Sequence, residues 1–486
     1  MTLPITDAKP RLLSVADAEA LSIRDIWRLH GSHISPRQVN IFSSFGYGHD
    51  VFMQSEGMWM TTADGRRILD FTGGFGVLNH GHNHPRILAA RRAFADSKRM
   101  EVHKVVFSPY MTALAHNVAS LLPGDLNKCF FPNSGAEAVE GALKIAYKSR
   151  PDRRAFVLHA EDSFHGKLIA SGTITGSQAK VWDFPSLPNT ASFRRNDLDS
   201  VEALVRSLRK PEGGSNVYAI AIEPFHATTM TPCSGEFLAG LRAICDREGI
   251  ALIFDEVYSG WGKSGHLFAF MAHDVVPDML CMSKSFGGGK ASISGLVVRD
   301  PVFMAAYGTD GTALLQSSTY NGFGEECVTA LEAVNIVVEE DFPARARHIH
   351  AVLREGFERL QAKFPGAIKE VRGQGGFNGM VLNSPFELIE KAIAHVPFLL
   401  KDKRYFINKI AAAAVVDEMY RNHGILSTMT ENGDLVLYSA LPSLIAGDAE
   451  LRQYLGALEQ VLDKGLMRVS AEFVGSKLAM MLKGMA

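Results

Sequence analysis

An amine, an acid and a turn that could bind phosphate each follow a short apolar run in the middle of this sequence. Lys284 follows the apolar residues 279–282 after a single serine and precedes the glycines 287–289. Burial at a strand end removes water from a lysine, which lowers its pKa and makes its neutral amine a nucleophile. A lone lysine is more often a solvated surface residue, and Lys290 is a second candidate. We favour Lys284 because it leaves the predicted strand directly.

The acid is Asp255, which ends the apolar run 251–254. A carboxylate at the end of a buried strand costs free energy unless it is paired. A metal ion, an arginine or a protonated ring nitrogen would each be a suitable partner. The alternative interpretation of Asp255 is a helix cap or a structural ion pair.

The turn lies at Ser134 and Gly135, between a predicted strand at 128–131 and a predicted helix that begins near Ala136. A helix that starts directly after such a turn presents free N–H groups and the positive end of its dipole, which together bind phosphate. The alternative interpretation is an ordinary strand-to-helix turn in which Ser134 caps the helix.

Further strands must position these residues. Apolar runs that alternate with helical patterns predict an α/β fold, with a mostly parallel sheet flanked by helices. Ligands of such sheets lie beyond the carboxyl ends of the strands. The predicted strands are residues 128–131, 156–158, 217–222, 251–254, 279–282 and 295–298. Four of them are followed by a residue that could act in a site: Ser134, Glu223, Asp255 and Lys284.

Changes of pattern along the chain suggest three regions. Residues 69–335 form the predicted large domain, and residues 336–486, where helical patterns dominate, form a smaller α+β domain. Residues 1–68 contain a turn signal at 63–65 and two short strand-like runs, and are expected to pack with the small domain. An apolar segment at about 385–409 interrupts the small domain, between strand-like residues 377–382 and 435–438.

Composition excludes several classes of protein. The 486 residues are enough to bury a core without disulfides or metals. A net charge of −2 lacks the basic character of nucleic-acid binding. Five cysteines without a CxxC spacing argue against a disulfide framework or a zinc ribbon, and favour the cytoplasm. The longest tempting apolar stretch, 410–416, is far shorter than the ~20 residues that cross a bilayer, so no membrane association is expected.

Two apparent motifs do not support a site. Gly262-Lys263-Ser264 resembles the end of a P-loop, but Val257 stands where that motif needs its first glycine. The histidines at 80, 82 and 84 lack a second group of ligands, so no metal site is expected.

The motifs, in this order and spacing, resemble those of the class III (ω-) aminotransferases, which are enzymes of fold type I that use pyridoxal 5'-phosphate (PLP). The resemblance covers most of the chain and is nearest to the putrescine and ornithine branch. It rests on the segments 71–85 (FTGGFGVLNHGHNHP), 130–146 (FFPNSGAEAVEGALKIA), 164–166 (FHG), 223–224 (EP), 254–265 (FDEVYSGWGKSG), 277–289 (PDMLCMSKSFGGG) and 317–320 (SSTY).

The resemblance implies a role for each candidate residue. Lys284 would hold PLP as a Schiff base and move a proton between the substrate carbon and the cofactor, and Asp255 would keep the pyridine nitrogen protonated. The phosphate would be bound by Ser134, by the N–H groups of Gly135 and Ala136, and by Thr319 of the partner subunit of a homodimer. The other implied contacts are Phe164 and Val257 on the two ring faces, Tyr258 near the phenolate oxygen, and His165 and Glu223 as supporting groups.

The implied function is a ping-pong transfer of an amino group from an amine or amino acid, of ω-amine or diamine type, to a keto acid or aldehyde. An aminomutase with the same fold is an alternative, because its site would hold the same residues. A non-catalytic protein that merely keeps the fold is disfavoured by the intact Lys284, Asp255 and phosphate-binding turn.

Three departures from the family pattern bear on the substrate. Tyr258 replaces the usual glutamine, and residues 225–229 (FHATT) replace a glycine-rich run. No arginine stands near Val436, where the family places one that grips a carboxylate, so dicarboxylate substrates are less expected. Together with the apolar segment 385–409, this makes amination of an apolar medium-chain aldehyde the alternative function. That segment could instead be an added helix pair, or a surface that docks a carrier or partner domain.

Overall fold

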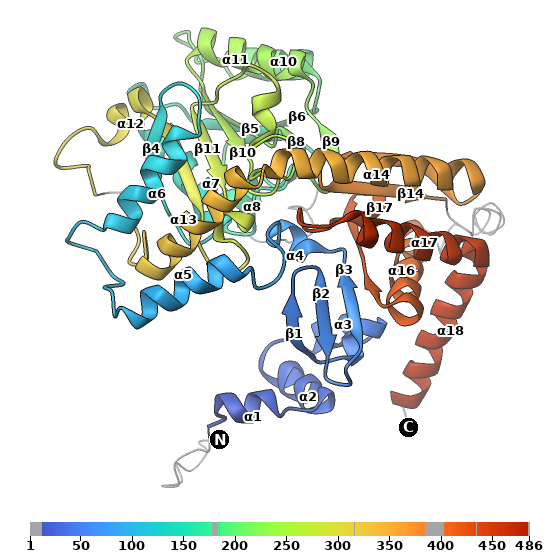
Figure 1. Ribbon diagram of the computed structural model, residues 1–486. Helices are drawn as coiled ribbons and strands as arrows, with labels where there is room; N and C mark the ends of the chain where they lie inside the picture. Colours follow the sequence, from blue (N-terminus) through green and yellow to red (C-terminus); the bar gives the residue numbers. More distant parts are fainter. Residues whose placement is uncertain are drawn as a thin grey trace, which may run out of the picture.

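The computed structural model describes residues 12–176, 183, 185–314, 316–383, 403–433 and 435–484, with side chains left out for 403–408 and 477–484. Most of the apolar segment 385–409 therefore lies outside the described residues. Figure 1 shows three parts: a large sheet with helices around it, a smaller sheet beside it, and an N-terminal sheet below both.

The central sheet has the order β4-β12-β11-β10-β7-β5-β6. Its strands are parallel to their neighbours except β12, which runs antiparallel to both β11 and β4. The mostly parallel sheet is thus confirmed. The bounds are β4 (Leu126–Phe130), β5 (Phe156–Ala160), β6 (Thr190–Phe193), β7 (Val217–Ile222), β10 (Ala251–Asp255), β11 (Met279–Met282) and β12 (Gly295–Arg299).

Helices cover both faces of this sheet because both faces are apolar. In β10, Ile253 packs with the cluster that contains α7 and α12, while its neighbours Leu252 and Phe254 belong to the core on the other face. Alternate residues of a strand point to opposite faces, so an uninterrupted apolar run fills two layers at once. The first face carries α7 (Gly135–Lys148) and α12 (Asp300–Tyr307), and the second carries α6 (Pro109–Ser120), α10 (Leu198–Ser207), α11 (Gly235–Glu248) and α13 (Gly324–Glu339).

The smaller sheet is antiparallel, in the order β13-β14-β17-β16. The strand-like runs predicted near 377 and 435 are β14 (Phe377–Leu382) and β17 (Leu435–Ala440), and they pair directly. The helix α13 continues past residue 335, so the helices of the smaller part begin with α14. Its other elements are β13 (Ile368–Gln374), β16 (Thr428–Asn432), α14 (Phe342–Lys363), α16 (Lys403–His423), α17 (Asp448–Lys464) and α18 (Leu466–Gly484).

The N-terminal sheet contains strands from both the N-terminal part and the C-terminal third of the chain. It contains three N-terminal strands where the sequence suggested two, and β15 from the C-terminal third pairs in parallel with β3. The side chains of β1 are largely exposed, so it has no alternating apolar pattern to reveal it. The elements here are α1 (Val15–Glu19), α2 (Ile23–His33), α3 (Pro36–Phe42), β1 (Phe52–Glu56), β2 (Trp59–Thr62), β3 (Arg67–Asp70) and β15 (Ile425–Leu426).

Among the described residues, no helix is both long and apolar enough to span a membrane. The short elements near the sheet edge are α4 (Gly73–Gly76), α5 (Pro85–Asp96), α8 (Ile169–Thr173), β8 (Phe225–His226), β9 (Thr231–Pro232) and the 3₁₀ helix η3 (Lys284–Gly287).

Candidate active site

A cavity of about 410 Å³ lies at the carboxyl ends of β4, β7, β10 and β11. Parallel strands end at one edge of a sheet, so residues far apart in sequence meet there. Thr319 lies outside this cavity and is exposed on its own chain. Ten predicted site residues line the cavity: Ser134, Gly135, Ala136, Phe164, His165, Glu223, Asp255, Val257, Tyr258 and Lys284.

Lys284 begins η3 one residue after the end of β11 and has a backbone φ of 52°. A positive φ at a residue with a side chain costs about 1–3 kcal/mol and is concentrated at functional sites. Burial lowers the pKa of its amine to about 7, against the opposing effect of the carboxylates of Asp255 and Glu223. Its Nζ lies 3.0 Å from the centroid of the Tyr258 ring. The rival candidate, Lys290, is exposed and does not line the cavity.

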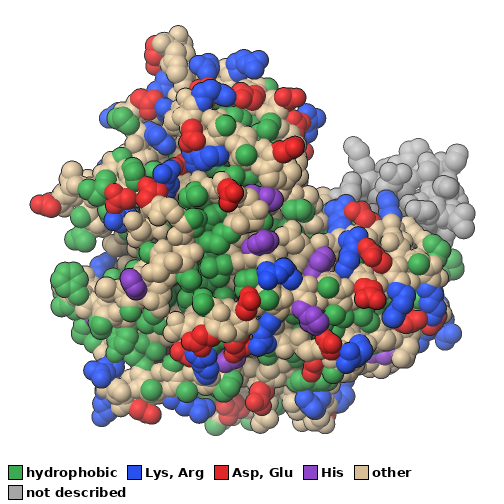
Figure 2. Space-filling view, turned by 45° about the horizontal axis from the view of Figure 1, so that its top comes forward, with side chains coloured by type: hydrophobic (Ala, Val, Ile, Leu, Met, Phe, Trp, Pro, Cys, Tyr) green, Lys and Arg blue, Asp and Glu red, His purple; other side chains and the backbone are tan. Residues whose placement is uncertain are grey.

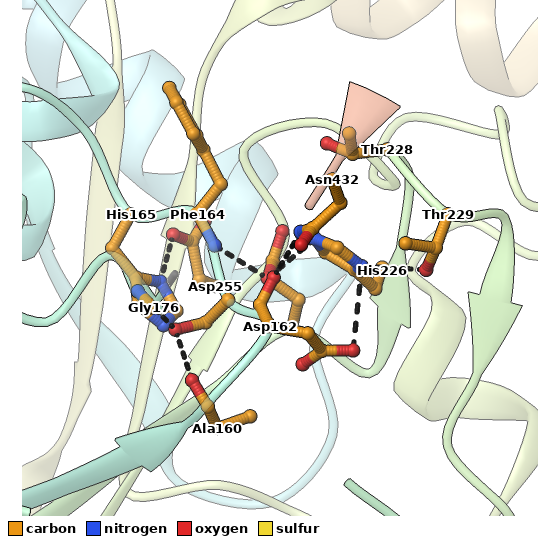
Figure 3. A network of polar contacts seen from close by, with 12 residues as sticks. Ala160, Asp162, Phe164, His165, Gly176, His226, Thr228, Thr229, Asp255 and Asn432 are labelled. Carbon is orange, nitrogen blue, oxygen red and sulfur yellow. Dashed lines mark hydrogen bonds and ion pairs between the residues drawn. The ribbon is translucent and has the colours of Figure 1, made fainter. Parts of the chain in front are cut away.

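Two donors hold the Asp255 carboxylate, which lines the cavity, and Figure 3 shows one of them, His165. Its Oδ2 lies 2.8 Å from Nδ1 of His165, and its Oδ1 accepts the Val257 N–H at 3.0 Å. A carboxylate is an acceptor, so Nδ1 of His165 carries the proton in this contact. Asp255 is therefore a buried carboxylate with a fixed orientation, and its negative charge acts on the amine of Lys284.

The N-terminus of α7 opens onto the same cavity. Ser134 caps this helix: its Oγ accepts the Glu137 N–H, and the Glu137 carboxylate accepts the Ser134 N–H. Neither Gly135 nor Ala136 has an intrahelical acceptor for its N–H, because both lie in the first turn. A Cβ on Gly135 would lie 2.8 Å from both methyl groups of Val257, so only glycine fits there. The turn is thus both a capped helix start and a pair of N–H donors suited to an anion.

A buried network that the sequence analysis missed supports Glu223. Its Oε2 accepts the Phe164 N–H at 3.1 Å and lies 3.5 Å from Nη2 of Arg195. Arg195 also donates to the Glu223 carbonyl and pairs with Asp162. Burial raises the pKa of Glu223 to about 7. Arg195 and Asp162 follow β6 and β5 in loops without a recognisable motif, so only their position after a strand could have indicated them.

Residues 225–229, which stand in place of the family's glycine-rich run, belong to a small hairpin of β8 and β9. This hairpin contacts the small sheet. Thr430 in β16 donates to the Thr228 carbonyl at 2.8 Å, and Asn432 donates to the Asp162 carbonyl at 2.7 Å. Figure 3 shows Thr228 and Asn432 on one side of the site, with Asp255 and His165 on the other. The hairpin therefore connects the cavity wall to the small sheet.

The residue at the expected arginine position, Val436, does not line the cavity. Val436 packs in the main core, whereas its neighbour Leu437 belongs to the apolar cluster of Phe225 and Phe377. Adjacent residues of a strand point to opposite faces, so β17 presents Leu437 on the side of that cluster. Neither Val436 nor Leu437 lines the cavity, so no arginine-like contact is made from this part of β17.

Lys263 was considered in the sequence only as part of a false P-loop, yet it is fully buried. Its Nζ donates to the Pro442 carbonyl at 2.5 Å. Burial lowers its pKa to about 7, against the opposing charge of Asp70. Lys263 joins the loop after β10 to the segment after β17, and so fixes the small sheet against the site.

The sequence model of the class-III aminotransferases matches residues 46–462. An ornithine aminotransferase from Toxoplasma gondii ME49 superposes with a TM-score of 0.76 at 23% identity, over 95% of this chain and 100% of that one. A transaminase from the marine bacterium Virgibacillus gives 0.76 at 19% identity, over 92% and 100% of the two chains. An acetylornithine aminotransferase from Elizabethkingia anophelis gives 0.70 at 21% identity, over 91% and 100%. These structures share the fold of this chain.

Proposed function

Since this chain belongs to the class III aminotransferases, which depend on PLP, we propose that it moves an amino group from a primary amine or amino acid to a keto acid or aldehyde by a ping-pong cycle. The observation that supports this proposal is the meeting of Lys284, Asp255 and the N-terminus of α7 in one cavity. A cytoplasmic location, expected from the cysteine pattern, is part of the same proposal.

The residues of the cavity fit PLP. The N–H groups of Gly135 and Ala136 and the hydroxyl of Ser134 provide donors for its phosphate at a helix N-terminus. The Asp255 carboxylate suits a protonated ring nitrogen, and the Lys284 amine suits an aldehyde. Phe164 and Val257 also line the cavity and would cover the two faces of the ring.

When bound, PLP supplies an electrophilic aldehyde and a ring that accepts electrons. Lys284 would hold the aldehyde of the bound cofactor, and its Nζ would take the proton from the substrate carbon that carries nitrogen. A pKa near 7 keeps much of this amine neutral at physiological pH. Asp255 would keep a proton on the ring nitrogen of the bound cofactor, and His165 holds the Asp255 carboxylate in place. Glu223 holds the backbone of Phe164.

A half-reaction tests the ping-pong cycle. We expect an excess of a suitable amine, without any carbonyl acceptor, to convert the bound PLP completely to pyridoxamine phosphate and to release one aldehyde per site. A keto acid or aldehyde should then restore the starting absorbance. The donors to compare first are ornithine and putrescine, because the sequence resembles that branch. Rearrangement of one substrate without an acceptor would instead indicate an aminomutase.

A homodimer is part of this proposal, and exposed apolar side chains support it. Val105, Phe107 and Leu314 are 93%, 98% and 84% exposed. They lie in the segments after α5 and α12, near the segment that carries Thr319. Figure 2 shows hydrophobic side chains gathered on the left of the molecule, the side on which Figure 1 places α5 and α12. A partner subunit would cover them and bring its own Thr319 to the phosphate.

Phe107→Asp is expected to weaken the dimer at least about 100-fold, because an interface would bury the new charge. Sedimentation equilibrium of the unmodified protein should give twice the chain mass of 53.0 kDa. Met467→Asp is the matched control, since Met467 is 62% exposed on α18. An unmodified protein that stays monomeric would contradict the proposal.

A further inference from the structure

Three aromatic side chains form one wall of the cavity. Phe225 and Tyr258 line the cavity, and Phe377 packs behind both of them. The Phe377 ring centroid lies 4.8 Å from that of Phe225 and 5.1 Å from that of Tyr258. We call Phe225, Tyr258 and Phe377 the aromatic wall. The side chains packed with the wall are apolar as well: Ala227, Met230, Ala269, Val381, Leu435, Leu437 and Leu441.

The described lining of the cavity offers no cation for a substrate carboxylate. Its only basic side chains are His165 and Lys284, and both have roles at the cofactor. Lys263, behind the wall, donates to the Pro442 carbonyl. The guanidinium of Arg372 is bound by Glu370 and donates to the Thr229 carbonyl. A carboxylate buried against the wall would therefore lose its hydration without gaining a partner.

The same part of the structure offers no free acid for the second ammonium group of a diamine. The acidic residues that line the cavity are Asp255 and Glu223. Asp255 is occupied by His165 and Val257. Glu223 accepts the Phe164 N–H and lies beside Arg195, whose positive charge would repel an ammonium group. The wall thus differs from a site built for a substrate with a charge at its far end.

Resting on the aminotransferase function proposed above, we infer that the aromatic wall binds an apolar chain. The substrate class is a primary aliphatic amine, or its aldehyde, with no carboxylate and no second ammonium group. In the reaction R–CH₂–NH₂ + R'–CO–R'' → R–CHO + R'–CH(NH₂)–R'', the C–N bond of the donor breaks and a C–N bond forms on the acceptor. The donor carbon is oxidised by two electrons and the acceptor carbon is reduced by two, so no outside oxidant is needed.

A chain-length series on the holoenzyme tests this inference. We expect the specificity constant of the half-reaction to rise about fourfold per methylene from propylamine to hexylamine, as for a chain that leaves water. Hexylamine should exceed putrescine and ornithine at least about 100-fold. Calorimetric binding of the unreactive alcohols 1-propanol to 1-hexanol to the holoenzyme should show the same rise in affinity, independently of catalysis.

The outcomes separate this inference from the proposed function. If ornithine or putrescine reacts faster than hexylamine, or if the series is flat, the aminotransferase function stands and the apolar substrate class is wrong. If no amine or amino acid converts the cofactor, the proposed function is wrong, and this inference with it.

A variant tests whether the aromatic wall causes the dependence of the specificity constant on chain length. Phe225→Leu should lower the specificity constant for hexylamine at least about 10-fold and that for propylamine less than about threefold, because only the longer chain is expected to extend as far as Phe225. Phe357→Leu is the matched control: it removes an equally buried ring from α14, outside the cavity, and should change neither rate. An equal loss for both amines in Phe225→Leu would overturn the assignment, and the series on unmodified holoenzyme tests it even if this variant does not fold.

Discussion

Replacing Lys284 by alanine is expected to lower kcat at least about 10⁴-fold, because one side chain both holds the cofactor aldehyde and moves the proton at the substrate carbon. The variant should also lack the covalent bond between the protein and PLP. After reduction with borohydride, mass spectrometry of the unmodified protein should find PLP on Lys284, and the variant should carry none. The side chain lies in the wall of a cavity and makes no ion pair in the described structure, so the variant should fold.

Lys290→Ala is the control for this experiment, since Lys290 is exposed, lies six positions further along the chain and does not line the cavity. Its activity and its cofactor content should match those of the unmodified protein. The assignment of Lys284 would be wrong if PLP were found on Lys290 after reduction. A protein whose activity survived Lys284→Ala unchanged would not be an aminotransferase of the kind proposed.

Replacing Asp255 by asparagine is expected to lower kcat about 1,000-fold while the protein still folds and binds PLP. An amide has nearly the same shape but no charge, so it does not hold a proton on the ring nitrogen. It also leaves either the His165 or the Val257 donor without its acceptor, since only one of its two terminal atoms is an oxygen. Rapid mixing with an amine should show a slower half-reaction, with the final extent of conversion retained.

Asp278→Asn is the matched control, because Asp278 is also buried and ion-paired but lies just before β11, at the amino end of that strand. Loss of its pairing with Arg242 should lower the free energy of unfolding. The kcat per folded enzyme should stay within about twofold, since the far end of the strand is away from the cavity. If Asp255→Asn kept more than a tenth of the activity, its proposed role would be wrong.

Local patterns in the sequence determined the central sheet and the residues at its edge. The bounds of β7 and β11 were predicted to the residue, because a strand buried on both faces is an unbroken apolar run. The start of α7 could also be predicted from the sequence, since Ser134 and Glu137 cap it within one turn. Lys284, Asp255 and Ser134 could be expected to meet because the carboxyl ends of parallel strands share one edge.

Weak local patterns produced the errors. The edge strand β6 and the N-terminal strand β1 have mostly exposed or half-exposed side chains, so they lack the alternation that reveals a strand. The sequence also left open which residues of β17 face which apolar cluster. A shift of one residue along β17 exchanges the two faces of the strand, and no residue type within the run marks which face meets the site.

Only the tertiary structure decided what surrounds these residues. The aromatic wall joins Phe225 to Phe377, and Lys263 reaches the carbonyl of Pro442 across the boundary between the two sheets. Arg195 supports the site through its ion pairs with Asp162 and Glu223, which follow other strands. Such contacts depend on the register of strands and on how separate segments pack, and these are set by the sum of many weak interactions over the whole chain. A sequence therefore shows which groups can react, whereas packing decides which substrate can reach them.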